Sequence, residues 1–308
     1  MTQKHRLFAL ALAAPVLFVP ACCARPDFAR AALNAASIPA MNALHRLTAR
    51  IPFPVAEPLA LLLTGVALWA LLRAAFRACR SRCLRPLRGW LRALACAALP
   101  VVGAFALFWA PACAQPIAAV PQTDDGRLAL LCDALIGALN DAPLAFPGPP
   151  DILARAAEAA DMPGCAVKAA RYPEWMALSR AWGLFVPLTG EALVDAAEPV
   201  PLLPFTAVHE LMHLSGIADE GAANIAAWNR CLEAGGPFAD SARLWALRYA
   251  MGLLRCRDEA AWRRTGQKMK GALARVYAAC GGDIEPRHPR RLSLIRGDYA
   301  ALVGYLAG

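Results

Sequence analysis

The sequence predicts a mainly α protein, with three N-terminal transmembrane helices followed by a helical domain that has at most a small β element. Two observations support this fold class. The chain has 308 residues, of which 58% are apolar and only 18% charged, a balance outside the usual range of soluble proteins. Its long apolar runs all lie in the first third, whereas the remainder shows the apolar spacing of amphipathic helices. We therefore expect a membrane domain over residues 1–111 and a second domain over residues 112–308.

Three apolar runs in the first domain are long enough to approach a membrane span. They cover about residues 7–24, 56–72 and 93–110, each close to the roughly 20 residues that cross a bilayer core. The first run follows the basic start Lys4-His5-Arg6, so it is either a retained span or a secretory signal. Three such runs within one short segment favour membrane helices over buried core helices.

The loop between the second and third runs is strongly basic. It carries seven arginines and no acidic residue, namely Arg73, Arg77, Arg80, Arg82, Arg85, Arg88 and Arg92. Basic loops stay in the cytoplasm, so we expect a multi-pass protein of the cell membrane whose second domain lies outside the cytoplasm. These arginines account for most of the net charge of +9, and no nucleic-acid motif accompanies them. The basicity therefore predicts the membrane topology and no nucleic-acid partner.

The second domain is expected to be helical, with a short linker over residues 112–121. One stretch is richer in strand-forming residues: Trp182 to Asp195 carries Pro187 and Gly190 and predicts a short edge strand or hairpin. Glu191 in this stretch is either a cleft residue or a surface or capping acid. Helical spacing is found in the segments Leu128–Leu139, Ile152–Ala160, Asp240–Arg255 and Glu259–Ala279.

The pattern H-E-x-x-H occurs at His209, Glu210 and His213. On a helix, residues four apart project from the same face, so two imidazole nitrogens can share one Zn²⁺ ion. Glu210 then falls beside the metal, where a carboxylate can take a proton from a zinc-bound water. We therefore expect His209 and His213 to be metal ligands and Glu210 to be a catalytic base.

Two adjacent acids compete for the third ligand position, which leaves one position open for water. Read through Gly216, the string resembles the metzincin pattern, with Asp219 in place of its last histidine. Read one residue further, Glu220 begins a string similar to the E-x-x-A-D of prenyl-protein (CAAX) membrane proteases. Asp219 is also a favoured helix N-cap, so we prefer Glu220, with Asn224 one turn on to orient it. Gly216 allows the required chain reversal.

The chain resembles a bacterial membrane family called domain of unknown function 3810. The matching strings are IPFPVAEPLALLL, FALFWAPACAQ, GLFVPLTGEALVD and LPFTAVHELMHLSGIADEGAANIAAW. The resemblance implies three N-terminal spans and an outer, zincin-like domain of undetermined substrate. Two departures are notable. Ala222 stands where the family usually has a second acid, which leaves Glu220 as the retained acid, and residues 110–113 replace an aromatic and Arg-rich string.

These observations predict a membrane-anchored, zinc-dependent metallopeptidase-like hydrolase of the bacterial envelope, acting on a protein or peptide. One alternative is a non-hydrolytic zinc-binding scaffold or sensor, although such a site has no use for Glu210. Another is a zinc amidase acting on a non-protein envelope substrate. The residue that would stabilise the oxyanion is left open by the sequence, with four candidates: Tyr249, Tyr277, Tyr299 and His288.

Overall fold

The computed structural model describes residues 17–115, 124–174, 176, 181–284 and 298–307. The chain divides into two compact units. Unit 1 comprises Met1–Pro116 and the separate loop Val186–Glu191, and unit 2 comprises Ile117–Phe185 and Ala192–Gly308. The assignment of a distant loop to unit 1 is not anticipated by the sequence.

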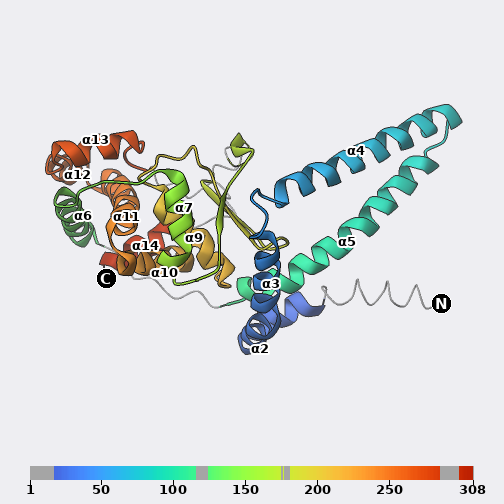
Figure 1. The fold of residues 1–308 in the computed structure, drawn as a ribbon, viewed down its shortest axis with the longest axis horizontal. Coiled ribbons are helices and arrows are strands. Elements are labelled where there is room, and N and C mark those ends of the chain that lie inside the picture. Colours follow the sequence, from blue (N-terminus) through green and yellow to red (C-terminus); the bar gives the residue numbers. More distant parts are fainter. Residues whose placement is uncertain (1–16, 116–123, 175, 177–180, 285–297, 308) are drawn as a thin grey trace. The chain divides into compact units, whose positions relative to one another are not determined.

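Unit 1 is helical (Figure 1). Its elements are α2 (Pro26–Ala32), the π-helix η1 (Leu33–Ser37), α3 (Ile38–Thr48), α4 (Ala56–Ser81) and α5 (Arg85–Cys113). Helices α4 and α5 form an antiparallel hairpin, in which the indole nitrogen of Trp90 donates to the carbonyl of Ala67 at 3.2 Å.

Helices α4 and α5 are long and apolar enough to cross a membrane. Both continue beyond the predicted spans 56–72 and 93–110, because arginine is a good helix former and extends each helix into the basic turn. Most of the first predicted span, residues 7–16, lies outside the described residues. Of the three predicted spans, the described residues thus support two.

The loop Val186–Glu191 is fixed within unit 1 by backbone and side-chain contacts. The carboxylate of Glu191 accepts hydrogen bonds from the backbone amides of Val55 (2.8 and 3.0 Å) and Ala56 (2.7 Å), at the N-terminus of α4. Nδ1–H of His45 donates to the carbonyl of Gly190 at 2.7 Å. Gly190 has a φ of +67°, and a Cβ there would lie 2.7 Å from backbone atoms of α3. Of the two roles weighed for Glu191, the structure thus gives it the capping one.

We predict that Glu191→Ala destabilises the protein by about 1–3 kcal/mol, because two amides at a helix N-terminus lose a buried acceptor. Glu191→Gln should cost less, since its amide oxygen still accepts a hydrogen bond. Thermal unfolding in detergent measures both, with Glu259→Ala in an exposed ion pair as the control. Equal stability of Glu191→Ala and the control would contradict the capping role.

Unit 2 is mainly helical with a small sheet, as predicted. Its helices are α6 (Asp125–Asn140), α7 (Pro149–Ala159), α9 (Leu203–Leu214), α10 (Glu220–Ala234), α11 (Gly236–Arg257), α12 (Glu259–Gly266), α13 (Gly271–Ala279) and α14 (Asp298–Ala307). The strands are β1 (Val167–Ala169), β2 (Gly183–Val186) and β3 (Glu191–Val194), in the order β1-β3-β2. Strand β1 runs parallel to β3, with Val167 opposite Ala192.

Helix α9 is the core element of unit 2. All twelve of its residues are buried, and it packs against α7, α10 and α11. The segment Glu259–Ala279 is helical, as its spacing predicts, and it forms two helices, α12 and α13, with a break between Gly266 and Gly271. Two glycines flanking this polar stretch weaken the helix there.

The buried side chain of Glu198 contacts α9 at Thr206. Oε1 of Glu198 accepts a hydrogen bond from the hydroxyl of Thr206 at 3.0 Å. Its Oε2 is buried, with no hydrogen-bond partner among the described residues. Burial raises the pKa of Glu198 well above its ordinary value, outweighing the opposing effects of Thr206 and Arg248. The neutral acid is therefore the form that the folded state favours.

We predict that Glu198→Gln becomes more stable relative to the wild type as the pH rises. When the pKa of a carboxyl group is higher in the folded state than in the unfolded state, the contribution of that group to stability is complete below the unfolded pKa of about 4.5. The contribution is lost as the pH rises above that value, with a limiting slope of about 1.4 kcal/mol per pH unit. Glutamine keeps the acceptor for Thr206 and cannot ionise. Urea unfolding from pH 4.5 to 7 measures the difference, which should be flat for the exposed control Glu233→Gln. A flat difference for Glu198→Gln as well would refute the assignment.

Candidate metal centre

The N-terminal end of α9 is fixed by side chains of α11. The hydroxyl of Ser241 accepts a hydrogen bond from the amide of Phe205 and donates one to the carbonyl of Leu202, both at 3.1 Å. The indole nitrogen of Trp245 donates to the same carbonyl at 3.1 Å. Because the first amides of a helix have no partner within it, these contacts fix both the start and the rotation of α9.

The C-terminal end of α9 turns back immediately. Gly216 has a φ of +98°, its amide donates to the carbonyl of His213 at 2.9 Å, and the amide of Ile217 donates to Met212 at 3.3 Å. This is the left-handed cap for which glycine is favoured. The predicted reversal is thereby confirmed. It brings the carbonyl of Ile217 within 2.6 Å of Nδ1 of His213.

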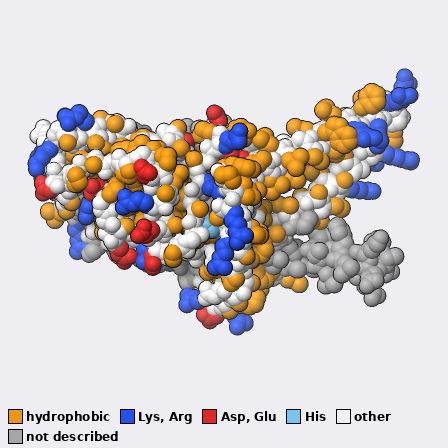
Figure 2. Space-filling view, viewed as in Figure 1, with side chains coloured by type: hydrophobic (Ala, Val, Ile, Leu, Met, Phe, Trp, Pro, Cys, Tyr) orange, Lys and Arg blue, Asp and Glu red, His pale blue; other side chains and the backbone are white. Residues whose placement is uncertain are grey.

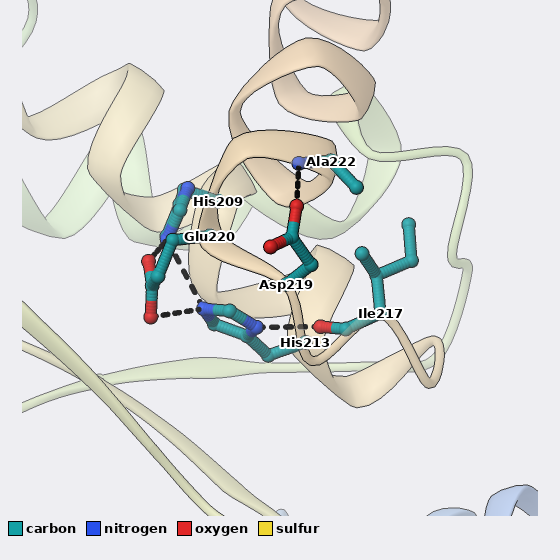
Figure 3. Close-up of polar contacts among 6 residues, drawn as sticks. All are labelled: His209, His213, Ile217, Asp219, Glu220 and Ala222. Atoms are coloured by element: carbon teal, nitrogen blue, oxygen red, sulfur yellow. Dashed lines mark hydrogen bonds and ion pairs between the residues drawn. The ribbon is translucent and has the colours of Figure 1, made fainter. Parts of the chain in front are cut away.

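The two histidines and Glu220 converge (Figure 3). Oε2 of Glu220 lies 3.1 Å from Nε2 of His209, and Oε1 lies 3.5 Å from Nε2 of His213. The two Nε2 atoms are 3.1 Å apart. All three ligand atoms lie within 4.8 Å of one another, and the Glu220 side chain is 39% exposed, so the group opens to solvent on that side.

The competing acid, Asp219, has a different position. It is the N-cap of α10, and its Oδ1 accepts a hydrogen bond from the amide of Ala222 at 2.8 Å (Figure 3). This bond satisfies one of the free amides at the helix start. As a result Glu220 becomes the first residue of α10 and reaches the two imidazoles, whereas the Asp219 carboxylate is held at the helix end.

Burial and the neighbouring carboxylates set the charges of this group. Burial lowers the pKa of His209. At His213 burial has the same effect, but the hydrogen bond with Glu220 and the nearby carboxylates outweigh it and raise the pKa to about 9. Burial tends to raise the pKa of Glu220, and the two histidines overcome it and hold that pKa well below its usual range. A carboxylate that stays ionised beside two imidazoles is a suitable donor set for a divalent cation.

Glu210 lies against strand β2. A Cβ at Gly183 would lie 2.7 Å from both Cγ and Cδ of Glu210, so any larger residue there would displace the Glu210 side chain. The amide of Phe185 hydrogen-bonds to the Glu210 carboxyl group. Burial raises the pKa of Glu210 to about 8, against the opposing effect of His213. Sequence reasoning missed Gly183, although it is the first residue of the GLFVPLTGEALVD string.

Asn224 is buried on α10, and its side chain lies close enough to His209 to act on the pKa of that histidine, in the raising direction. The sequence predicts that it orients Glu220, one turn away on the same helix. Asn224 therefore acts on this group through His209 of α9, a relation that spacing along α10 alone does not predict.

The oxyanion candidates are placed unequally. The hydroxyl of Tyr277 donates to Asp283 at 2.6 Å, and the ring of Tyr249 stacks on Trp245. Tyr299 lies on α14, and His288 falls outside the described residues. None of these observations places an oxyanion donor beside Glu210.

Comparison with known proteins gives one match. The family described as "Protein of unknown function (DUF3810)" matches residues 38–279. No curated protein and no solved structure matches the chain. The matched stretch runs from α3 to α13, so it includes α9, the start of α10 and strand β2. Because the match covers well over half of its residues, the chain belongs to the DUF3810 family.

Proposed function

We propose that this protein is a membrane-anchored, zinc-dependent hydrolase of the metallopeptidase type. The observation that carries the proposal is the arrangement of four side chains. His209, His213 and Glu220 direct ligand atoms at one point, and Glu210 lies beside them without belonging to the group. Three protein ligands with an adjacent free carboxylate are typical of catalytic rather than structural zinc sites.

The donor set fits zinc because of the histidine tautomer. Nδ1 of His213 faces the carbonyl of Ile217, an acceptor only, so this nitrogen carries the proton. Nε2 is then the nitrogen that faces the convergence point, and once a bound metal ion displaces its proton its lone pair is available as a ligand. A zinc ion held by His209, His213 and Glu220 would supply Lewis-acid chemistry to this site.

Glu210 is the base and the proton carrier in this proposal. Its carboxylate takes a proton from the attacking water, holds it, and releases it to the leaving amine. The pKa of about 8 applies to the metal-free protein. A cation held by the adjacent histidines lowers that value, because an opposite charge favours the carboxylate. The base is thereby available near neutral pH.

A peptide is the substrate class that the surroundings of Glu210 favour. Strand β2 lies at an edge of the sheet, and its backbone reaches Glu210 through Gly183 and Phe185. An extended peptide can pair with the backbone of an edge strand, which gives affinity without requiring a particular side chain. This observation favours a peptide over a lipid or cell-wall amide. A non-hydrolytic zinc scaffold gives no reason for the close fit around Glu210.

The membrane placement is part of the proposal. Helices α4 and α5 have the length and composition of spans, and the seven arginines lie in the turn between them and on the helix ends that adjoin this turn. The positive-inside tendency places that turn in the cytoplasm and unit 2 outside it.

Zinc analysis of the purified protein tests the ligand set. His209→Ala, His213→Ala and Glu220→Ala should each lose zinc, whereas Glu210→Gln should keep it and lose cleavage in a peptide-library screen. Asp219→Asn should also keep zinc, because asparagine caps a helix nearly as well as aspartate. Full zinc in Glu220→Ala together with its loss in Asp219→Asn would move the third ligand to Asp219. Unchanged zinc in both histidine variants would end the proposal.

Gly183→Ala tests the fit around Glu210 separately from the metal. The added methyl group should displace the carboxyl group and lower peptide cleavage roughly 10- to 100-fold, because small misplacements of catalytic groups are costly. Bound zinc should stay at the wild-type level. Gly137→Ala is the matched control, since a Cβ there meets no atom within 4 Å. Full activity in Gly183→Ala would contradict the role of Glu210 in its observed position.

Reporter fusions test the orientation. A reporter that is active only outside the cytoplasm should work when fused after Gln115 and fail when fused near Arg82. The reverse pattern would place unit 2 and its metal centre in the cytoplasm, without affecting the zinc predictions.

A further inference from the structure

The end of the α4–α5 hairpin carries a dense positive charge (Figure 2). The side chains of all seven arginines between residues 73 and 92 are exposed. None of them forms an ion pair with another described residue, and the segment contains no acid. Such a concentration of unneutralised charge is unfavourable unless anions compensate it.

The arginines form a face on each helix. On α4 they occupy positions 73, 77 and 80, and on α5 positions 85, 88 and 92. Residues spaced by three and four lie on one side of a helix. The buried side chains on this end of α4 are Ala74 and Ala78, small residues that let the arginine faces stay at the surface. Each helix end therefore presents three guanidinium groups in a row.

Helix length places these rows at the depth of lipid headgroups. The 26 residues of α4 span about 39 Å at 1.5 Å per residue, against a hydrocarbon core of about 30 Å. The excess of about 9 Å is about six residues, so it contains Arg77 and Arg80, and Arg73 lies within one further turn. The side chains of Trp69, Leu72 and Phe76 alternate with the arginines and are exposed. Arg73 lies over the ring of Trp69 at 5.2 Å, an arrangement suited to the membrane interface.

We infer that this hairpin end is a binding site for the phosphate headgroups of anionic phospholipids. The guanidinium fork matches a phosphate with two parallel hydrogen bonds, and the exposed apolar side chains between the arginines lie where acyl chains begin. A basic cluster directly beside a span attracts anionic lipids. The inference rests on α4 and α5 being membrane spans, and it is independent of the metal centre.

Lipid titration of the full chain, purified in a neutral detergent and followed by native mass spectrometry, tests the inference. Phosphatidylglycerol should bind at concentrations at least tenfold below those needed for phosphatidylcholine. The variant R73Q/R77Q/R80Q/R85Q/R88Q/R92Q should lose this preference. The control R263Q/R264Q/R275Q, on the surface of unit 2 and equal in number to the substitutions on either helix end, should retain it.

Further arms separate the other outcomes. Inorganic phosphate that displaces phosphatidylglycerol at equal concentration would show a free-phosphate site and overturn the lipid assignment. Equal binding of both lipids by the wild type would overturn it as well. If the sixfold variant does not accumulate, R73Q/R77Q/R80Q and R85Q/R88Q/R92Q are measured singly, and each should weaken the preference severalfold. Release of the wild type from membranes by alkaline carbonate would show that α4 and α5 do not span the membrane, and it would overturn the lipid site as well.

Discussion

The hydrogen bond from Nδ1 of His213 to the carbonyl of Ile217 is the contact on which the geometry of the candidate metal centre depends. It forms because Gly216 takes up a left-handed conformation and reverses the chain within one turn of α9. The same reversal brings Asp219 to the start of α10, where its capping bond leaves Glu220 directed at the histidines. The tautomer of His213, the start of α10 and the position of the Glu220 carboxylate thus follow from a single glycine. Because the chain reverses at once, the six residues between His213 and Glu220 are enough to bring the Glu220 carboxylate back to the two histidines.

Local signals made part of this structure predictable. The spacing of His209 and His213, the glycine after α9 and the N-cap before α10 each act within a few residues, and the apolar composition of α4 and α5 needs no tertiary information. The preference for Glu220 over Asp219 used the same kind of reasoning, and the structure brings Glu220 to the histidines. The ends of α4 and α5 were less predictable. The arginines end the apolar span, but because arginine is a good helix former the helix itself continues through them.

The features that the sequence did not predict involve contacts between distant segments. Gly183 lies 27 residues before Glu210, and nothing in its own neighbourhood indicates that a carboxyl group will occupy the space of its side chain. Glu198 reaches Thr206 from a preceding turn, and Glu191 caps a helix that begins 135 residues earlier. An acid with no local role in a sequence is equally consistent with a surface, a cap or a cleft. Only the fold distinguishes these.

The loop Val186–Glu191 has a consequence for dissecting the protein. The chain passes between the two units not once, at the linker near residue 116, but again on each side of this loop. A fragment that begins after the linker would therefore contain the loop Val186–Glu191 without the helices α3 and α4 that it contacts. A fragment that ends at the linker would contain α4 without the Glu191 carboxylate that caps it. Neither piece is a self-contained module. Either unit is therefore best studied in the undivided chain.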